Sequence, residues 1–253
     1  DHRDLHSFPT RRSSDLSEYI RIFGLGESAA EEKIKDMIED AVNPTIAPYC
    51  SEGECMFRVT MTGTQDITPE ETDLSRLYDT VDNIKERLGG YIYEIGNRSL
   101  PEVVFDKLSE LGLTVSFAES CTGGMIGAAI TDIPGSSKVF KGAVTVYSNE
   151  SKKAVLGVSR ELLDRYGAVS RETAEAMALS CRKLFCTDYA VAVTGVAGPG
   201  ESENKPAGLV HLCLASDGGT VFRRLDIRKD RSRIRKITVL NAFDMIRKEL
   251  ELK

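Results

Sequence analysis

The sequence predicts an α/β protein, with a C-terminal α/β sandwich built on a mixed sheet and a small α+β domain before it. The first observation is that strand-like and helix-like segments alternate along the second half of the chain, as in a sheet covered by helices. The second is that the preceding part reads strand–helix–strand–helix–strand. With 253 residues the chain is long enough for two cores. We expect domains at residues 17–96 and 97–253, after a leader at residues 1–16.

The leader differs in character from the rest of the chain. Its sequence, "DHRDLHSFPTRRSSDL", is polar and has neither a helical nor a strand period. It resembles a translated adaptor, and the alternative is a native leader without regular structure. It contains no secretory apolar stretch, so nothing in it indicates export.

The elements of residues 17–96 follow from apolar periodicity and from the residues that begin and end helices. Thr68-Pro69 and Gly89-Gly90 are residue types that favour the beginning and the end of a helix. Pro44 and Pro48 exclude a helix from their own segment. The expected elements are a strand at 19–26, a helix at 27–42, a strand at 55–64, a helix at 68–90 and a strand at 91–95, followed by a linker at 96–100.

The elements of residues 97–253 alternate along the chain. Ser170 is the expected N-cap of the helix at 170–185. The segment at 188–195 is apolar throughout, which indicates a buried strand. The expected elements are helices at 101–113, from about 121 to 131, and at 149–157, 170–185 and 230–250, with strands at 114–120, 140–148, 188–195, 207–216 and 220–227.

The composition excludes several classes of protein. The chain is 41% hydrophobic and 28% charged, which is ordinary for a globular protein, and it has no apolar run long enough to cross a bilayer. Its net charge is −6, and only residues 223–236 are basic enough for a nucleic-acid footprint. The six cysteines form no C-x2-C pair, and we expect Cys181 and Cys186 in the core, so no metal site is predicted. We expect a cytoplasmic protein with reduced thiols.

A hydroxyl lies at a predicted junction between a strand and a helix. The segment from Ser116 to Gly124 reads "SFAESCTGG" and places Ser120 at this junction. Serine there is commonly a helix N-cap, and the alternative is a nucleophile beside backbone N–H groups that bind an anion. The adjacent Cys121 is intrinsically more nucleophilic, but its position favours a small packing residue.

A nucleophilic Ser120 requires a base, and histidine is nearly excluded. Two of the three histidines lie in the leader, and His211 lies within a predicted strand, where a structural role is favoured. The remaining route is a lysine kept neutral by burial or by nearby cations. Lysines are numerous, but "VTVYSNESKK" places Lys152 about one turn into a helix that follows a strand end. Tyr147, at the end of that strand, could relay the proton.

Two further segments could bind an anion. The segment from Val193 to Gly208, "VTGVAGPGESENKPAG", follows a buried strand, and its glycines would let backbone N–H groups approach a ligand closely. An ordinary turn rich in glycine and proline is the alternative. The basic segment at 223–236 is either a solvated helix face or a site for a ligand phosphate.

Five motifs in a fixed order carry a resemblance to a known family. They are "AESCTGG" (118–124), "PGSS" (134–137), "YSNESK" (147–152), "GAVS" (167–170) and "VTGVAGP" (193–199). Over residues 100–250 the chain resembles the C-terminal domain of the CinA family (competence/damage-inducible proteins), the nicotinamide-nucleotide amidohydrolase (PncC) domain. The segments "IRIFGLGES" and "NPTIAPY" resemble the KH-like middle domain of that family. Full-length members usually also carry a domain similar to molybdopterin-binding proteins, so we expect this chain to be a fragment.

The resemblance implies deamidation of nicotinamide mononucleotide to nicotinic acid mononucleotide and ammonia, in pyridine nucleotide recycling. By motif, it implies that Ser120 is the nucleophile and that Tyr147 and Lys152 assist it, with N–H groups around residues 121–124 binding the oxyanion. Glu119 is expected to be a hydrogen-bonding group or a structural partner. The implied substrate-binding residues are Glu119, Cys121, Thr122, Gly123, Gly124, Thr194, Gly195, Ala197, Gly198, Arg231 and Arg235. No cofactor is implied, and the family tends to form homodimers.

One loop departs from the family pattern. The family places a glycine-rich stretch of about six residues between AGP and KP, whereas "AGPGESENKP" has five residues there and lacks paired glycines. This departure keeps open a second hypothesis, a nucleotide-binding or scaffold protein without turnover. A third, RNA binding through the KH-like domain, is disfavoured because "FGLGES" lacks a GxxG loop flanked by basic residues.

Overall fold

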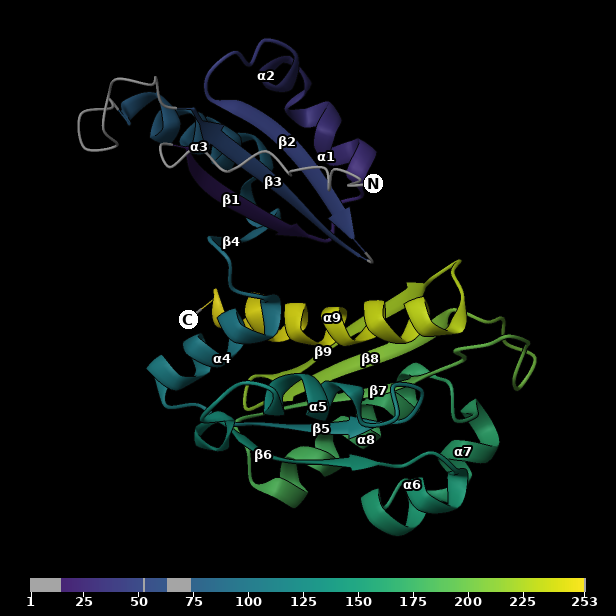
Figure 1. Ribbon diagram of the computed structural model, residues 1–253. Coiled ribbons are helices and arrows are strands. Elements are labelled where there is room, and N and C mark those ends of the chain that lie inside the picture. Colours follow the sequence, from purple (N-terminus) through teal and green to yellow (C-terminus); the bar gives the residue numbers. More distant parts are fainter. Residues whose placement is uncertain (1–14, 52, 63–73, 253) are drawn as a thin grey trace, which may run out of the picture. The chain divides into compact units, whose positions relative to one another are not determined.

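The computed structural model describes residues 15–51, 53–62 and 74–252. The chain divides into two compact units, one ending at Asn97 and the other beginning at Arg98 (Figure 1). Residues 1–14 of the predicted leader lie outside the described residues, and so does the predicted helix start at Thr68-Pro69.

The N-terminal unit is a four-stranded antiparallel sheet with the strand order β2-β3-β1-β4. Side chains of β3 alternate between buried and half-buried, so one face of the sheet forms the core. Four residues of α3 at helical spacing, Leu77, Val81, Ile84 and Leu88, belong to that core. The elements are β1 (Leu16–Phe23), α1 (Glu27–Lys33), α2 (Lys35–Glu39), β2 (Thr45–Ser51), β3 (Glu54–Met61), α3 (Ser75–Leu88), η1 (Gly89–Tyr91) and β4 (Ile92–Ile95).

Three features of this unit differ from the prediction. The expected helix at 27–42 is two short helices, α1 and α2, which meet at Ile34. The strand β2 is additional: prolines exclude a helix, but Pro48 fits this strand because β2 lies at the sheet edge, where a missing N–H is tolerated. Leu16, assigned to the leader, is the first residue of β1 and pairs with Met61.

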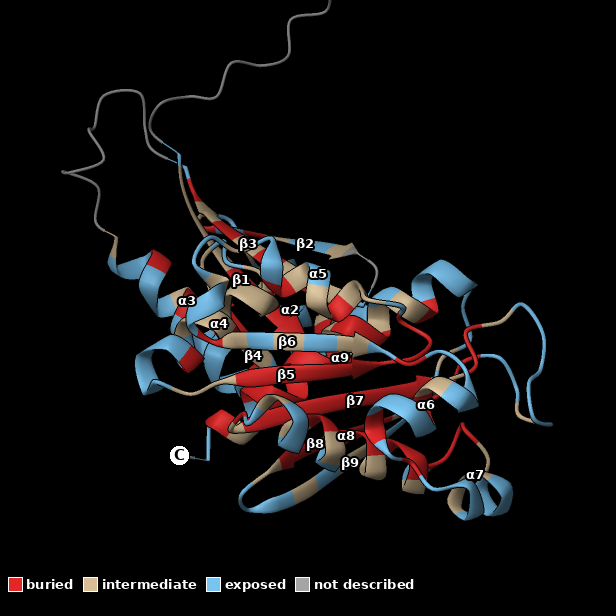
Figure 2. Cartoon of the chain, turned by 90° about the horizontal axis from the view of Figure 1, so that it is seen from below, coloured by how far each residue is buried: buried red, intermediate tan, exposed pale blue. Residues whose placement is uncertain are grey.

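The C-terminal unit is the predicted α/β sandwich on a mixed sheet. The strand order is β6-β5-β7-β8-β9, in which β6, β5 and β7 are parallel and β8 and β9 are antiparallel. The central strands β5 and β7 are buried along nearly their whole length (Figure 2). The elements are α4 (Leu100–Leu111), β5 (Val115–Glu119), α5 (Met125–Thr131), η2 (Ser136–Lys138), β6 (Phe140–Thr145), α6 (Asn149–Leu156), α7 (Arg160–Tyr166), α8 (Arg171–Phe185), β7 (Tyr189–Gly195), β8 (Leu209–Ser216), β9 (Gly219–Asp226) and α9 (Arg231–Leu250).

Helices cover both faces of this sheet. The helices α4, α5 and α9 lie on one face, and α8 lies on the other with α6 and α7 against it (Figure 1). The predicted cap of α8 is confirmed, since the hydroxyl of Ser170 accepts the N–H of Thr173. The prediction that Cys186 lies in the core is wrong: it is an exposed residue that ends α8 in a left-handed conformation, whereas Cys181 is buried.

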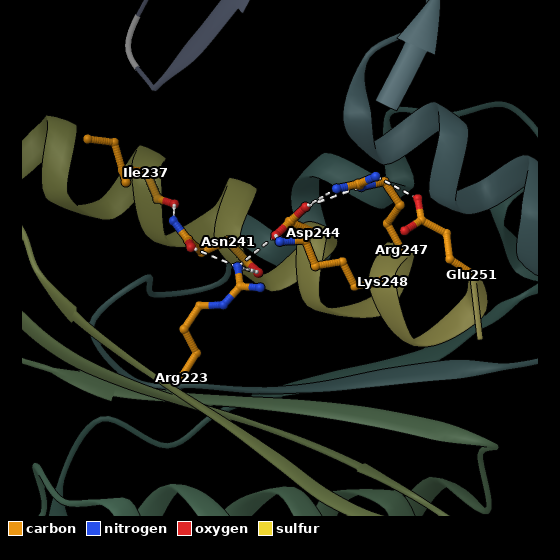
Figure 3. A network of polar contacts seen from close by, with 7 residues as sticks. All are labelled: Arg223, Ile237, Asn241, Asp244, Arg247, Lys248 and Glu251. Carbon is orange, nitrogen blue, oxygen red and sulfur yellow. Dashed lines mark hydrogen bonds and ion pairs between the residues drawn. The ribbon is translucent and has the colours of Figure 1, made fainter. Parts of the chain in front are cut away.

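A buried carboxylate ties α9 to the sheet (Figure 3). Asp244, 1% exposed, accepts a hydrogen bond of 2.9 Å from Arg223 on β9 and one of 2.8 Å from Arg247 on its own helix. Arg223 also donates to the side chain of Asn241. Because the buried carboxylate has charged partners on both sides, its desolvation is compensated, and α9 is fixed against β9.

This topology determines where a site can form. The carboxyl ends of the parallel strands β6, β5 and β7 reach the same edge of the sheet. In open α/β sheets, ligands bind outside this edge. The motif segments that begin at residues 118, 147 and 193 follow or end these three strands.

Candidate active site

A cavity of about 390 Å³ lies beyond the carboxyl ends of the three parallel strands, within the size range of small-ligand pockets. It is lined by residues 120–121, 147–149, 152, 168–169, 194–203 and 231. Segments from four of the five motifs therefore meet at one place.

Ser120 and Lys152 are in direct contact in this cavity. The Nζ of Lys152 lies 3.1 Å from the Oγ of Ser120, 2.9 Å from the carbonyl oxygen of Val146 and 3.4 Å from that of Tyr147. Lys152 lies in α6, whose first turn is capped by Ser148, and its side chain reaches inward until the residue is only 1% exposed. Burial lowers the pKa of Lys152 below its usual range, and the nearby carboxylate of Glu203 offsets part of that effect.

Ser120 was considered as a helix N-cap or as a nucleophile, and it does not cap α5. The N-cap position of α5 is Gly124, and no side-chain cap comes from it. The carboxylate of Glu119 instead accepts the N–H groups of Gly124, Ile126 and Gly127 at 2.9, 3.1 and 2.9 Å. Glu119 is fully buried and does not line the cavity. Glu119 is thus a structural partner of α5, and the substrate contact implied for it stays a prediction.

Two of the four N–H groups predicted to bind the oxyanion already donate to protein groups. The N–H of Gly123 donates to the carbonyl of Ser120, and that of Gly124 donates to Glu119. Within the described part of the chain, the N–H groups of Cys121 and Thr122 donate to no other protein group. Thr122, Gly123 and Gly124 do not line the cavity, and the substrate-binding role that the resemblance implies for them stays a prediction.

Cys121 lines the cavity but is not an activated thiol. It is 5% exposed, and burial raises the pKa of its thiol to about 12. A protonated thiol is a poor nucleophile. This agrees with the interpretation of Cys121 as a packing residue.

The two arginines predicted to bind phosphate have different positions. Arg231 lines the cavity, donates to the carbonyl of Gly198 at 2.6 Å and donates to the hydroxyl of Tyr147 at 3.3 Å. Arg235 does not line the cavity: it donates to the carbonyls of Cys121 and Thr122 at 3.1 and 2.7 Å. Arg235 therefore holds the loop that carries Ser120, and only Arg231 faces the ligand space.

The proton relay predicted for Tyr147 is not part of this arrangement. Its side chain is 62% exposed, and its hydroxyl accepts from Arg231, while Lys152 contacts Ser120 without an intermediary. Tyr147 still lines the cavity, at the side where Arg231 lies.

The predicted loop residues Thr194, Gly195, Ala197 and Gly198 all line the cavity. The hydroxyl of Thr194 donates to the carbonyl of Ala168 at 2.7 Å, which ties the end of β7 to the segment before α8. A Cβ on Gly195 would lie 2.8 Å from the carbonyl oxygen of Leu209, so only glycine fits at this position.

Several cavity residues were not among the site residues predicted from the sequence. Ser148, Asn149, Ala168, Val169 and Glu203 line the cavity as well. The carboxylate of Glu203 accepts the N–H groups of Ala168 and Val169, which lie more than thirty residues earlier in the chain. Such a contact has no periodicity, and only the GAVS and AGP motifs indicate the neighbourhood.

His211 has the structural role that the sequence favours. It lies in β8, does not line the cavity, and stacks on Phe222 with a ring-centroid distance of 5.5 Å. Burial lowers the pKa of its imidazole.

The described residues contain neither a candidate metal site nor a helix that could cross a membrane. Within residues 15–51, 53–62 and 74–252, no three His, Cys, Asp or Glu side chains cluster as a metal site would require. In those same segments, no helix has the length and apolar character to cross a membrane.

The fold and the site define a class: an α/β domain with a buried serine–lysine pair in a cavity at the ends of parallel strands. Residues 97–250 match the CinA C-terminal domain, and residues 17–93 match the KH domain of the damage-inducible protein CinA. The chain therefore belongs to the CinA family.

Similar proteins carry the same family name. A CinA-like protein from Dictyoglomus thermophilum is 46% identical over 92% of this chain and 56% of its own length. A crystal structure of a competence/damage-inducible protein from Agrobacterium tumefaciens is 42% identical, with a TM-score of 0.57, over 60% of this chain and 93% of its own. A crystal structure of a CinA superfamily protein from Klebsiella pneumoniae is 28% identical, with a TM-score of 0.59, over 62% of this chain and 100% of its own. The chain thus spans about half the length of the curated relatives it matches.

Proposed function

We propose that this protein hydrolyses the carboxamide of nicotinamide mononucleotide, giving nicotinic acid mononucleotide and ammonia, with Ser120 as the nucleophile and Lys152 as the base. One observation carries the proposal: the Nζ of a buried lysine lies 3.1 Å from the Oγ of Ser120. A nucleophile within hydrogen-bond reach of its base is the geometric requirement for this chemistry.

The contacts of Lys152 suit a neutral amine. A neutral primary amine has two N–H donors and one lone pair. The carbonyls of Val146 and Tyr147 can accept the two N–H groups, which leaves the lone pair for the Ser120 hydroxyl. Burial favours this neutral form. Lys152 can therefore take the Ser120 proton as the oxygen attacks the carboxamide carbon.

The rest of the reaction uses the same groups. Attack places a negative charge on the carboxamide oxygen, for which the N–H group of Cys121, a residue of the cavity lining, is available. Lys152 then returns the proton to the leaving nitrogen, and ammonia departs from an acyl-Ser120 intermediate. Water attacks that ester with Lys152 again as the base, which releases the carboxylate product and restores Ser120.

The phosphate of the substrate needs a cationic partner in the cavity. Arg231 is the arginine that lines the ligand space, and Tyr147 is hydrogen-bonded to it. Arginine binds phosphate well because its guanidinium presents several donors in a fixed plane. We assign the phosphate to Arg231 and to the backbone at Gly195, Ala197 and Gly198.

Product analysis with the full chain tests the proposal. With nicotinamide mononucleotide as substrate, we expect ammonia and nicotinic acid mononucleotide in equal amounts, and neither product from Ser120→Ala. If a folded parent chain binds the nucleotide, measured by titration calorimetry, but releases no ammonia, the proposal is wrong and the nucleotide-binding protein without turnover replaces it.

A further inference from the structure

The loop at residues 200–204, where the chain departs from its family pattern, forms a tight turn in the cavity wall. The main chains of Ser202 and Lys205 exchange two hydrogen bonds of 3.1 and 2.9 Å. The two residues between them, Glu203 and Asn204, have φ values of +53° and +57°, as a type I′ turn requires. Non-glycine residues seldom adopt this conformation, so other contacts must hold the turn in place.

The carboxylate of Glu203 makes those contacts. It accepts the N–H groups of Ala168 and Val169 at 3.1 and 3.2 Å and lies 3.3 Å from the Nζ of Lys205. Lys205 in turn donates to the carbonyl of Tyr166 at 3.1 Å.

The backbone of the neighbouring segment leaves room for this carboxylate. Gly167 has a φ of +80°, and a Cβ there would lie 2.5 Å from the Oε2 of Glu203. The segment at 166–169 therefore needs glycine at this position to admit the carboxylate. Hydrogen bonds to backbone N–H groups favour the ionised carboxylate and outweigh the opposing effect of burial, so the pKa of Glu203 is lowered.

We propose that Glu203 is a positioning residue of the site: bound to the N–H groups of Ala168 and Val169, its carboxylate fixes the loop at 200–204 as a wall of the cavity that holds Ser120 and Lys152. The effect of Glu203 on turnover rests on the proposed function, whereas its anchoring of the loop is independent of that function.

The fixed charge of Glu203 also acts on the base. The ionised carboxylate of Glu203 raises the pKa of Lys152 against the effect of burial, whereas the protonated thiol of Cys121 carries no charge. The other charged residues lining the cavity are Glu201, in the same loop, and Arg231. A negative charge favours protonated Lys152, so Glu203→Gln lowers its pKa further, and the neutral base exists at lower pH.

Hydrogen exchange tests the anchoring without any need for turnover. In Glu203→Ala the amides of Ala168 and Val169 lose their acceptor, and we expect them to exchange roughly tenfold faster or more, since hydrogen bonds to charged groups are of that strength. The matched control is Glu161→Gln, which removes an exposed carboxylate from α7, the helix before this segment, and leaves both amides protected. Unchanged exchange at residues 168 and 169 in Glu203→Ala overturns the proposal.

The pH profile tests the effect on the base. In Glu203→Gln we expect the acid limb of kcat/KM for ammonia release to move to lower pH, whereas Glu161→Gln keeps the limb of the parent. A lower rate with an unmoved limb contradicts the charge effect. If the parent releases no ammonia, the proposed function fails, and the exchange experiment still decides whether Glu203 anchors the loop.

Discussion

Lys152 shows how burial serves a chemical role at the scale of a single residue. Its side chain is among the largest fully buried ones of the described residues, although an ammonium group in such a place loses its hydration. Its Nζ is surrounded by two carbonyl oxygens and one hydroxyl, with no carboxylate bonded to it. These neighbours can hydrogen-bond a neutral amine fully, but none of them carries the negative charge that would compensate an ammonium ion.

The free-energy cost of burying Lys152 can be measured from the pH dependence of the free energy of unfolding. The folded-state pKa of Lys152 is lowered, whereas the unfolded chain has the ordinary value of about 10.4. Between the two values the unfolded state binds more protons, so the stability of the parent must rise with pH there. We expect the free energy of unfolding of the parent, relative to Lys152→Met, to increase over this interval in urea unfolding. A difference that is flat or falls with pH contradicts a lowered pKa.

Cys121 provides a second test among single residues. Because it is 5% exposed and its thiol has a pKa raised to about 12, iodoacetamide should label it only after unfolding. The exposed Cys186 should be labelled first, as followed by peptide mass spectrometry. Rapid labelling of Cys121 in the folded chain would make the thiol, rather than Ser120, the better nucleophile candidate.

Among the elements, α5 depends on Glu119 for its start. One carboxylate accepts the N–H groups of the N-cap residue and of two residues in the first turn, groups that a helix cannot satisfy by itself. We expect Glu119→Ala to lower the free energy of unfolding by about 2–4 kcal/mol, because buried N–H groups lose their acceptor. Urea unfolding followed by circular dichroism measures this loss.

The matched control for this prediction lies at the other end of the same helix. Asp132 is the exposed C-cap residue of α5, and Asp132→Ala should change the free energy of unfolding by no more than about 0.5 kcal/mol. If Glu119→Ala costs no more than this control, the carboxylate is not what holds α5 and the loop carrying Ser120.

At the scale of the whole molecule, the cavity belongs to one unit. Its lining residues run from Ser120 to Arg231, all within the unit that begins at Arg98. The solved relative from Agrobacterium tumefaciens covers 60% of this chain and 93% of its own, so a shorter chain of this family folds. We expect residues 98–253 to release ammonia with a kcat/KM within about threefold of the full chain. A folded unit with a loss above about tenfold would show that the N-terminal unit contributes to activity.

The sequence predicted elements whose pattern is local. Alternating or continuous apolar segments and helix caps predicted the α/β sandwich with a mixed sheet, and the family resemblance assigned Ser120, Lys152 and residues of the 193–199 segment to one site. The strand β2 escaped prediction because its prolines suggested only a break, and their tolerance depends on β2 being at the sheet edge. The helix α7 has seven residues and too few turns for a periodic signal.

The roles of the remaining site residues depend on contacts between distant parts of the chain. Arg235 bonds carbonyls more than one hundred residues earlier, and Glu203 bonds amides more than thirty residues earlier. Arg231 and Arg235 are one turn apart on the same helix, yet only one lines the cavity. The family motif assigns both arginines to the substrate, whereas the contacts of each side chain show that they have different roles.

The central claim is that Ser120 and Lys152 act as nucleophile and base. The most direct measurement is the rate of ammonia release from nicotinamide mononucleotide by the parent chain, Ser120→Ala and Lys152→Ala at one pH, with folding of each checked by circular dichroism. Residues that act as one catalytic unit lose activity to a similar extent when either is removed, so we expect both variants to fall by about a thousandfold or more. Activity within about tenfold of the parent in either folded variant contradicts the serine–lysine pair.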